Sequence, residues 1–220
     1  SGIRLATPYL YAGIGETFGQ RSGVLNLGVE GQMLLGAFAA FYAVQRTGNL
    51  VLGLVAAIIV GGLMGLAMAF VSVTLRAKQG ISGIGFFLFG LGMSDLLFQT
   101  LLGKVQTVSG FRPLPIPILS DIPVLGPIFF NQSLLVYTAY LLVPVAGFVM
   151  NKTTLGLKIR AVGENPEAAD SLGVSVARVR YITVTLGGVL SGIAGASLSI
   201  ALLNVFQQNL TSGLGFIAVS

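Results

Sequence analysis

The sequence predicts an all-α protein, a polytopic bundle of transmembrane helices with about six spanning or re-entrant segments. Of its 220 residues, 54% are hydrophobic and only 9% are charged, whereas soluble domains carry about a quarter charged residues. Three windows, 47–75, 122–151 and 181–220, contain no charged side chain at all. Each window is long enough to cross a hydrocarbon core of about 30 Å as a helix.

Six apolar segments are expected to form these helices. They cover residues 5–19, 27–44, 50–75, 81–102, 134–150 and 181–203. Helices are favoured over barrel strands because the runs are uniformly apolar and backbone polar groups in lipid must find partners within the segment. An uncharged tail rich in Asn, Gln and Gly follows, and re-entry into the membrane is one interpretation of it. We expect residues 1–220 to form a single transmembrane domain of a longer protein that has a helix or more beyond each end.

The basic residues predict the orientation. If the six segments alternate in direction, one side of the membrane receives Arg21, Arg76, Lys78, Lys152, Lys158, Arg160, Arg178 and Arg180. The other side receives Arg4, Arg46, Lys104 and Arg112. The side with more basic residues is expected to be cytoplasmic. The net charge of +5 therefore indicates charged loops and no nucleic-acid partner.

Small residues recur at four-residue spacing in two of the segments. Gly61 precedes Gly65, and Gly188 precedes Gly192. Such spacing lets helix backbones approach closely in lipid, where packing drives association. A tight bundle is predicted, without a particular helix pair.

The connection 103–133 contains five prolines. Because proline fixes φ and removes a backbone donor, this segment should be extended and stiff. It could serve as a lid or docking ledge, or be a linker without a role of its own.

The loop 151–180 contains the residues of a complete short helix. Asn165 suits the N-cap, Pro166 the first helical position, Glu167 the positive end of the helix dipole and Gly173 the residue past the C-terminus. A helix of two turns is marginal in water and must be held by other contacts. It is either a connector or a docking element for a cytoplasmic partner.

One face of this helix would be apolar. Ala168, Ala169 and Leu172 are expected to share it. Such a face would fit a groove on a partner protein.

The sequence of this loop resembles that of a known family. Residues 157–170, LKIRAVGENPEAAD, are similar to the coupling loop of ABC importer permeases of the ribose and branched-chain amino-acid class. Residues 16–31, ETFGQRSGVLNLGVEG, and the proline-containing stretch 115–127 resemble the nucleoside-type branch of that class, which is served by basic-membrane-protein lipoproteins.

The resemblance implies a permease subunit of an ATP-driven importer for nucleosides, with simple sugars as the alternative. It implies a second permease subunit, identical or different, two cytoplasmic ATPase subunits and an extracytoplasmic substrate-binding lipoprotein, in a bacterial inner membrane. The positions matching the family's ATPase-coupling helix are Asn165, Pro166, Glu167, Ala168, Ala169 and Gly173. The sequence has no Gly-x-x-x-x-Gly-Lys-Ser/Thr motif, so a partner is expected to hydrolyse ATP, and neither enzymatic activity nor a cofactor is expected in this chain.

Polar residues within the apolar segments are candidates for the substrate path, because polar groups are costly at membrane depth. Asn26, Glu30 and Gln32 lie where nearby glycines would permit a broken helix. Asp95 and Gln99 are four residues apart and share a helix face. For Glu30, a structural hydrogen bond to neighbouring backbone is an equally good interpretation.

Rival functions find less support. Gly80-Ile81-Ser82-Gly83 has the form of a serine nucleophile site, but the sequence has no His to act as its base. With no Cys or His, imidazole and thiolate metal ligation are excluded. An ion-coupled secondary transporter remains a less favoured alternative, since no inverted repeat is visible.

Overall fold

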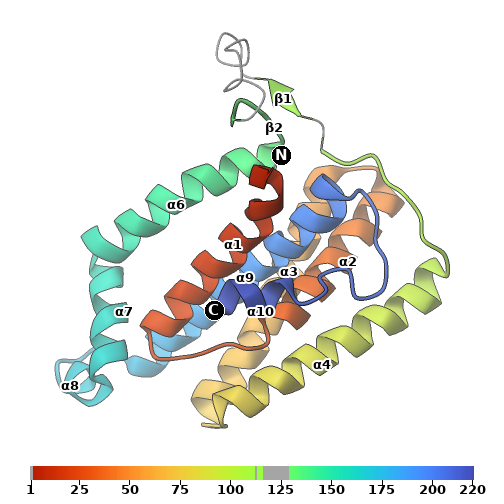
Figure 1. Cartoon of the computed structure of the whole chain (residues 1–220). Coiled ribbons are helices and arrows are strands. Elements are labelled where there is room, and N and C mark those ends of the chain that lie inside the picture. The colour runs from red at the N-terminus through yellow and green to blue at the C-terminus, as the bar shows by residue number, and fades with distance from the viewer. Residues whose placement is uncertain (1, 112, 116–128) are drawn as a thin grey trace.

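The computed structural model describes residues 2–111, 113–115 and 129–220 (Figure 1). The helices are α1 (Gly2–Arg21), α2 (Val29–Thr47), α3 (Leu50–Ala69), α4 (Gln79–Leu97), α6 (Leu134–Lys152), α7 (Thr154–Glu164), α8 (Pro166–Ser171), α9 (Val176–Ala196) and α10 (Leu214–Val219). Two short strands, β1 (Leu114–Pro115) and β2 (Asn131–Gln132), pair antiparallel. Wider π-helical turns extend α3, α4 and α9 through Phe70–Thr74, Phe98–Leu102 and Ser197–Leu202.

Six long helices in the described part of the chain confirm the predicted all-α bundle, and they alternate in direction, as the orientation argument requires. Four are long and apolar enough to cross a membrane: Leu50–Thr74, Gln79–Leu102, Leu134–Lys152 and Val176–Leu202. The remaining two, α1 and α2, are less apolar because they carry buried polar side chains. The predicted cytoplasmic basic residues gather at one end of the bundle, hereafter the basic end, and the opposite end is the far end.

Helix α9 is the centre of the bundle. In its apolar window 72% of residues are buried, against 28%, 22% and 17% in the windows of α3, α4 and α6. It packs against α1, α2 and α3. Helices α4 and α6 lie outside this core and present apolar side chains outward, which is expected of surfaces that meet lipid or another subunit.

The predicted glycines join α3 to α9. A Cβ atom at Gly188 would lie 2.6 Å from the Cα of Gly65, and a Cβ at Gly65 would lie 3.0 Å from the Cα of Gly188. Helix α2 packs on α9 as closely, since a Cβ at Gly36 would lie 2.6 Å from the Cα of Gly192. The prediction of a tight bundle is confirmed, and the structure identifies the helices involved.

The proline-rich connection lies at the far end. Its described parts are irregular apart from β1, where Leu114 pairs with Gln132 and Pro115 with Asn131. Residues 112 and 116–128, which include most of the prolines that predicted a stiff segment, lie outside the described residues.

The uncharged tail turns back into the bundle, as the re-entrant interpretation predicts. After α9 the chain is irregular from 203 to 213 and then forms α10, which packs on α1 and on α2 (Figure 1). The C-terminal end of the chain therefore lies beside α1 and not at the far end.

We expect Gly188→Val to destabilise the protein, because the added methyl groups meet the backbone of α3. Overpacking of this kind costs about 1–3 kcal/mol. Thermal denaturation in detergent measures the effect. Gly85→Val is the matched control, since a Cβ at Gly85 meets nothing within 4 Å. Equal stability of the two variants would contradict the glycine contact as the basis of the core.

Candidate functional site

The structure places Asn26, Glu30 and Gln32 in the interior. Their exposed fractions are 2%, 1% and 0%. The Asn26 side chain donates to Gln32 Oε1 (3.2 Å) and accepts from the backbone N–H of Gly28 (3.0 Å). The backbone N–H of Asn26 donates to Glu16 Oε1 (2.9 Å). The loop between α1 and α2 thus folds back to the depth of Glu16 before α2 begins.

Local sequence explains this broken entry to α2. Gly23 has φ +82°, which ends α1 in a tight turn. Gly31 then lets α2 press against α4, where a Cβ at Gly31 would lie 3.0 Å from the Cα of Phe87. The glycines predicted to permit a discontinuous helix therefore serve both to turn the chain and to admit a neighbouring helix.

The carboxylate of Glu30 accepts three hydrogen bonds from the re-entrant tail. Thr211 Oγ1 donates to Oε1 (2.5 Å), the Gly213 N–H donates to Oε1 (2.7 Å) and the Gly215 N–H donates to Oε2 (2.6 Å). No Lys or Arg among the described residues forms an ion pair with this carboxylate. Both oxygens accept hydrogen bonds. Glu30 therefore makes the structural bonds to backbone that the sequence offered as the alternative to a role in the substrate path.

Gln32 differs from its neighbours because one of its polar atoms is unpaired. Its Nε2 is buried and has no hydrogen-bond partner among the residues that the structure describes. A buried unpaired donor is costly, about 1–3 kcal/mol. The side-chain amide of Gln32 can therefore donate a hydrogen bond to one more acceptor.

The structure does not bring Asp95 and Gln99 to this group. Asp95 is half-buried on α4 and Gln99 is exposed one turn later, whereas Ser94 faces the interior. The Oδ1 atom of Asp95 is buried without a partner in the described part of the chain. The candidate path residues thus form two separate groups, one inside the bundle and one on its α4 surface.

Sequence reasoning missed two members of the interior group. Glu16, 3% exposed, was not among the candidate residues, although it fixes the Asn26 loop. Thr211, 0% exposed, lies 181 positions from Glu30 along the chain. No local spacing in the sequence could have indicated that contact.

The predicted helix in the loop 151–180 is present as α8. Asn165 Oδ1 accepts from the Ala168 N–H (3.0 Å), Pro166 occupies the first turn, and Gly173 follows with φ +82°. These are the roles that the sequence assigned to them. The loop holds a second helix, α7, which was not predicted.

The predicted apolar face of α8 is wrong in one member. Ala168 and Leu172 are exposed, Leu172 by 83%, and Glu167 is exposed beside them. Ala169 is only 3% exposed and packs in an apolar cluster with Phe18, Ile159, Val162 and Val179. Ala169 therefore anchors the short helix to the bundle.

Helix α7 supplies that anchoring surface. The Thr153 hydroxyl accepts from the Gly156 N–H (3.2 Å), and Gly156, Ile159 and Val162 are buried. This three- to four-residue period is typical of an amphipathic helix. Interleaved Lys158 and Arg160 made the segment look like a polar loop in the sequence.

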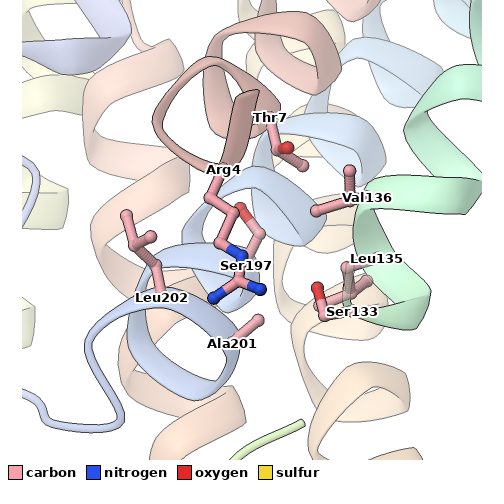
Figure 2. Close-up of a pocket in the computed structure, with 8 residues that line it drawn as sticks. All are labelled: Arg4, Thr7, Ser133, Leu135, Val136, Ser197, Ala201 and Leu202. Carbon is pink, nitrogen blue, oxygen red and sulfur yellow. The ribbon is translucent and has the colours of Figure 1, made fainter. Parts of the chain in front are cut away.

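A small pocket lies at the far end, between α1, α6 and the end of α9 (Figure 2). Arg4 reaches across it, donating from Nε to Gln132 Oε1 (2.6 Å) and from a terminal nitrogen to the Asn131 carbonyl (3.0 Å). The pocket holds about 10 Å³, the space of roughly one water. It is too small for an organic solute, so Arg4 acts here as a link between α1 and β2.

Among the described residues no three Asp, Glu, His or Cys side chains gather in a way that could hold a metal ion.

Comparison with known proteins gives a family. The family model described as branched-chain amino acid transport system / permease component matches residues 1–220. A Haloferax volcanii protein provisionally assigned as a glucose ABC transporter permease is 41% identical, covering 99% of this chain and 67% of that protein.

Two further relatives carry nucleoside names. A guanosine ABC transporter permease of Bacillus subtilis is 37% identical over 98% of this chain and 70% of its own length. A nucleoside ABC transporter permease of Lactococcus lactis is 34% identical over 98% and 71%. No solved structure matches the chain.

We expect Glu30→Ala to release the re-entrant tail, because the Thr211 hydroxyl and two backbone N–H groups lose their acceptor. Hydrogen exchange of peptides covering 203–219 should accelerate while that of α9 stays unchanged. Glu16→Ala is the control, since Glu16 bonds the Asn26 loop and not the tail. Unchanged exchange in 203–219 would contradict the structural role of Glu30.

Proposed function

The chain belongs to the branched-chain amino acid transport system permease family, and from that premise we propose that it is the membrane-spanning subunit of an ATP-driven importer that translocates nucleosides. The family match over residues 1–220 supports a multi-pass ABC transporter permease. The nucleoside substrate, the partners and the bacterial inner (cell) membrane as location are proposed.

The observation that carries ATP coupling is the position of α8. It stands at the basic end, fixed to the bundle by Ala169, and it turns Glu167, Ala168 and Leu172 to the outside. An apolar side chain that is 83% exposed, as Leu172 is, is costly in water unless a partner covers it. We propose that the grooves of two cytoplasmic ATPase subunits receive this helix and its copy in the second permease, with 151–180 as the coupling loop of a single 1–220 domain.

Two other surfaces support the remaining partners. The face of α4 carries Asp95 and Gln99 among apolar side chains, and polar groups at membrane depth favour a protein or water neighbour over lipid. A second permease subunit, identical or different, is proposed there, with the substrate path between the two chains. The substrate-binding lipoprotein would dock at the far end, near β1 and β2.

The substrate proposal rests on chemistry and on relatives. Nucleosides and sugars are neutral and rich in hydroxyl groups. Neutral amides, such as those of Asn26, Gln32 and Gln99, can hydrogen-bond these groups without the tight binding that a charged side chain would add. Two relatives are named for guanosine or nucleosides. The glucose name of another relative makes simple sugars the second candidate.

Uptake into proteoliposomes tests the proposal. The complete permease is reconstituted with its presumed partner permease, ATPases and binding lipoprotein, with ATP inside. We expect ATP-dependent uptake of radiolabelled guanosine that unlabelled nucleosides compete and glucose does not. Competition by glucose alone would indicate a sugar substrate in place of a nucleoside. Uptake that does not depend on ATP would contradict the proposed coupling to the ATPases.

The coupling surface makes a separate prediction. We expect Glu167→Lys combined with Ala168→Arg to abolish ATP-driven uptake, because two cations would enter the proposed groove contact while Ala169 still anchors the helix. Insertion and thermal stability should be unchanged. Thr47→Lys, at an exposed position of the far end, is the control for an added charge. Normal uptake by the double variant would rule out docking through α8.

A further inference from the structure

The segment 203–213 crosses the bundle without being helical. At the far end, Val205 forms a β-bridge with Thr107, and the Val108 N–H donates to the Asn204 carbonyl (3.0 Å). Towards the basic end, α10 follows, and the Gln20 side chain donates to the Val219 carbonyl (3.2 Å). The irregular backbone between these points therefore lies at membrane depth.

The inner side of this segment is apolar and well packed. Phe206, 0% exposed, lies 5.4 Å from Phe38 and 5.9 Å from Phe98 between ring centroids. Phe38 is near the middle of α2, which fixes Phe206 near the middle of the bundle. Leu210 and Thr211 are also buried.

The outer side of the segment is polar. Gln207, Gln208, Asn209 and Ser212 are all exposed. The three amide side chains make no hydrogen bonds within the part of the chain that the structure describes. Irregular backbone and free amides at this depth are tolerated only where they meet other protein or line a water-filled cavity.

The conformation of the segment is held under strain. Asn209 and Ser212 have φ of +51° and +45°, values that side-chain-bearing residues rarely adopt. Glu30 bonds Thr211 within this strained turn, and it also bonds Gly213 and Gly215, which follow the turn. Glu30 therefore fixes the direction in which the neighbouring amides face.

We propose that residues 207–212 form a solute-binding surface of the translocation path, with Gln207, Gln208 and Asn209 as the contacting side chains and Glu30 as their positioning residue. The inference rests on the proposed function. Amide groups offer donors and acceptors to hydroxyls and to the edges of a base, and a broken span is a recurrent way to present them to a solute.

Cysteine labelling tests the proposal in the reconstituted transporter. The 220 residues contain no Cys, so Gln208→Cys and Asn209→Cys each introduce one thiol into this part of the protein. A water-soluble methanethiosulfonate reagent should label both, because thiolates react where water reaches them. Leu88→Cys, on the apolar outer face of α4 and 57% exposed there, and Ser199→Cys, 0% exposed, should label far more slowly.

Protection by solute identifies binding. Guanosine and glucose are each tested at about ten times their Kd, where the transported one should slow labelling about tenfold, since labelling follows the unoccupied fraction. Absence of labelling at both positions would mean that other protein covers the segment and would overturn the proposal. Labelling that neither solute slows would also overturn it.

Glu30 variants test positioning apart from simple folding. In Glu30→Gln, Gln208→Cys should still be labelled but should lose most of its solute protection, and Glu30→Asp should restore part of it. Protection unchanged in Glu30→Gln would remove Glu30 from the proposal. Uptake by the unmodified transporter is measured first, so that absence of ATP-dependent uptake counts against the proposed function and unprotected labelling in an active transporter counts against this inference alone.

Discussion

The backbone of a chain in lipid must find partners for its N–H and C=O groups, and one carboxylate meets that need where this chain stops being helical. Glu30 accepts from a hydroxyl and from two backbone N–H groups of the re-entrant tail, all within 2.7 Å. Hydrogen bonds to a charged acceptor contribute about 1.5–3 kcal/mol each in proteins. Without this acceptor, the donors of Thr211 and Gly215 would be buried and unpaired, and the half-buried Gly213 would also lose its partner.

The glycine contacts of the core determine where that carboxylate lies. Gly188 and Gly192 of α9 admit α3 at backbone distance, and Gly192 also admits α2. Gly31 admits α4 at the start of α2, next to Glu30. Because α2 is fixed by close contacts on both sides, the Glu30 side chain has a defined place from which to hold the tail. The glycine contacts that position α2 thus also position the Glu30 carboxylate that bonds the tail.

Much of the architecture could be predicted from local sequence. Apolar segments predicted the six long helices, and the positions of Arg and Lys predicted their orientation. Asn165, Pro166 and Gly173 predicted α8 because capping depends on neighbours within a few residues. The substrate-path candidates at the start of α2 were found from their polarity, and the structure shows that Asn26, Glu30 and Gln32 are buried and that Asn26 bonds Gln32.

What could not be predicted depends on distant contacts. The Glu30–Thr211 bond joins residues 181 apart, and only the folded bundle brings them together. Ala169 was assigned to an outward face because its burial depends on how α8 folds back onto the buried Ile159 and Val162 of α7, and the capping residues of α8 do not indicate that contact. Asp95 and Gln99 were predicted to share a face, but the sequence could not tell that they lie away from Asn26.

A double-mutant cycle between Glu30 and Thr211 tests the central interaction most directly. The apparent stabilities of Glu30→Gln, Thr211→Val and the double variant are measured in detergent, with Ser22→Ala as a distant partner for comparison. If the bond holds the tail, the two effects should be non-additive by about 0.5–3 kcal/mol, whereas Glu30→Gln and Ser22→Ala should add. Additive effects of Glu30→Gln and Thr211→Val would show that the carboxylate does not hold the tail, and would contradict the account.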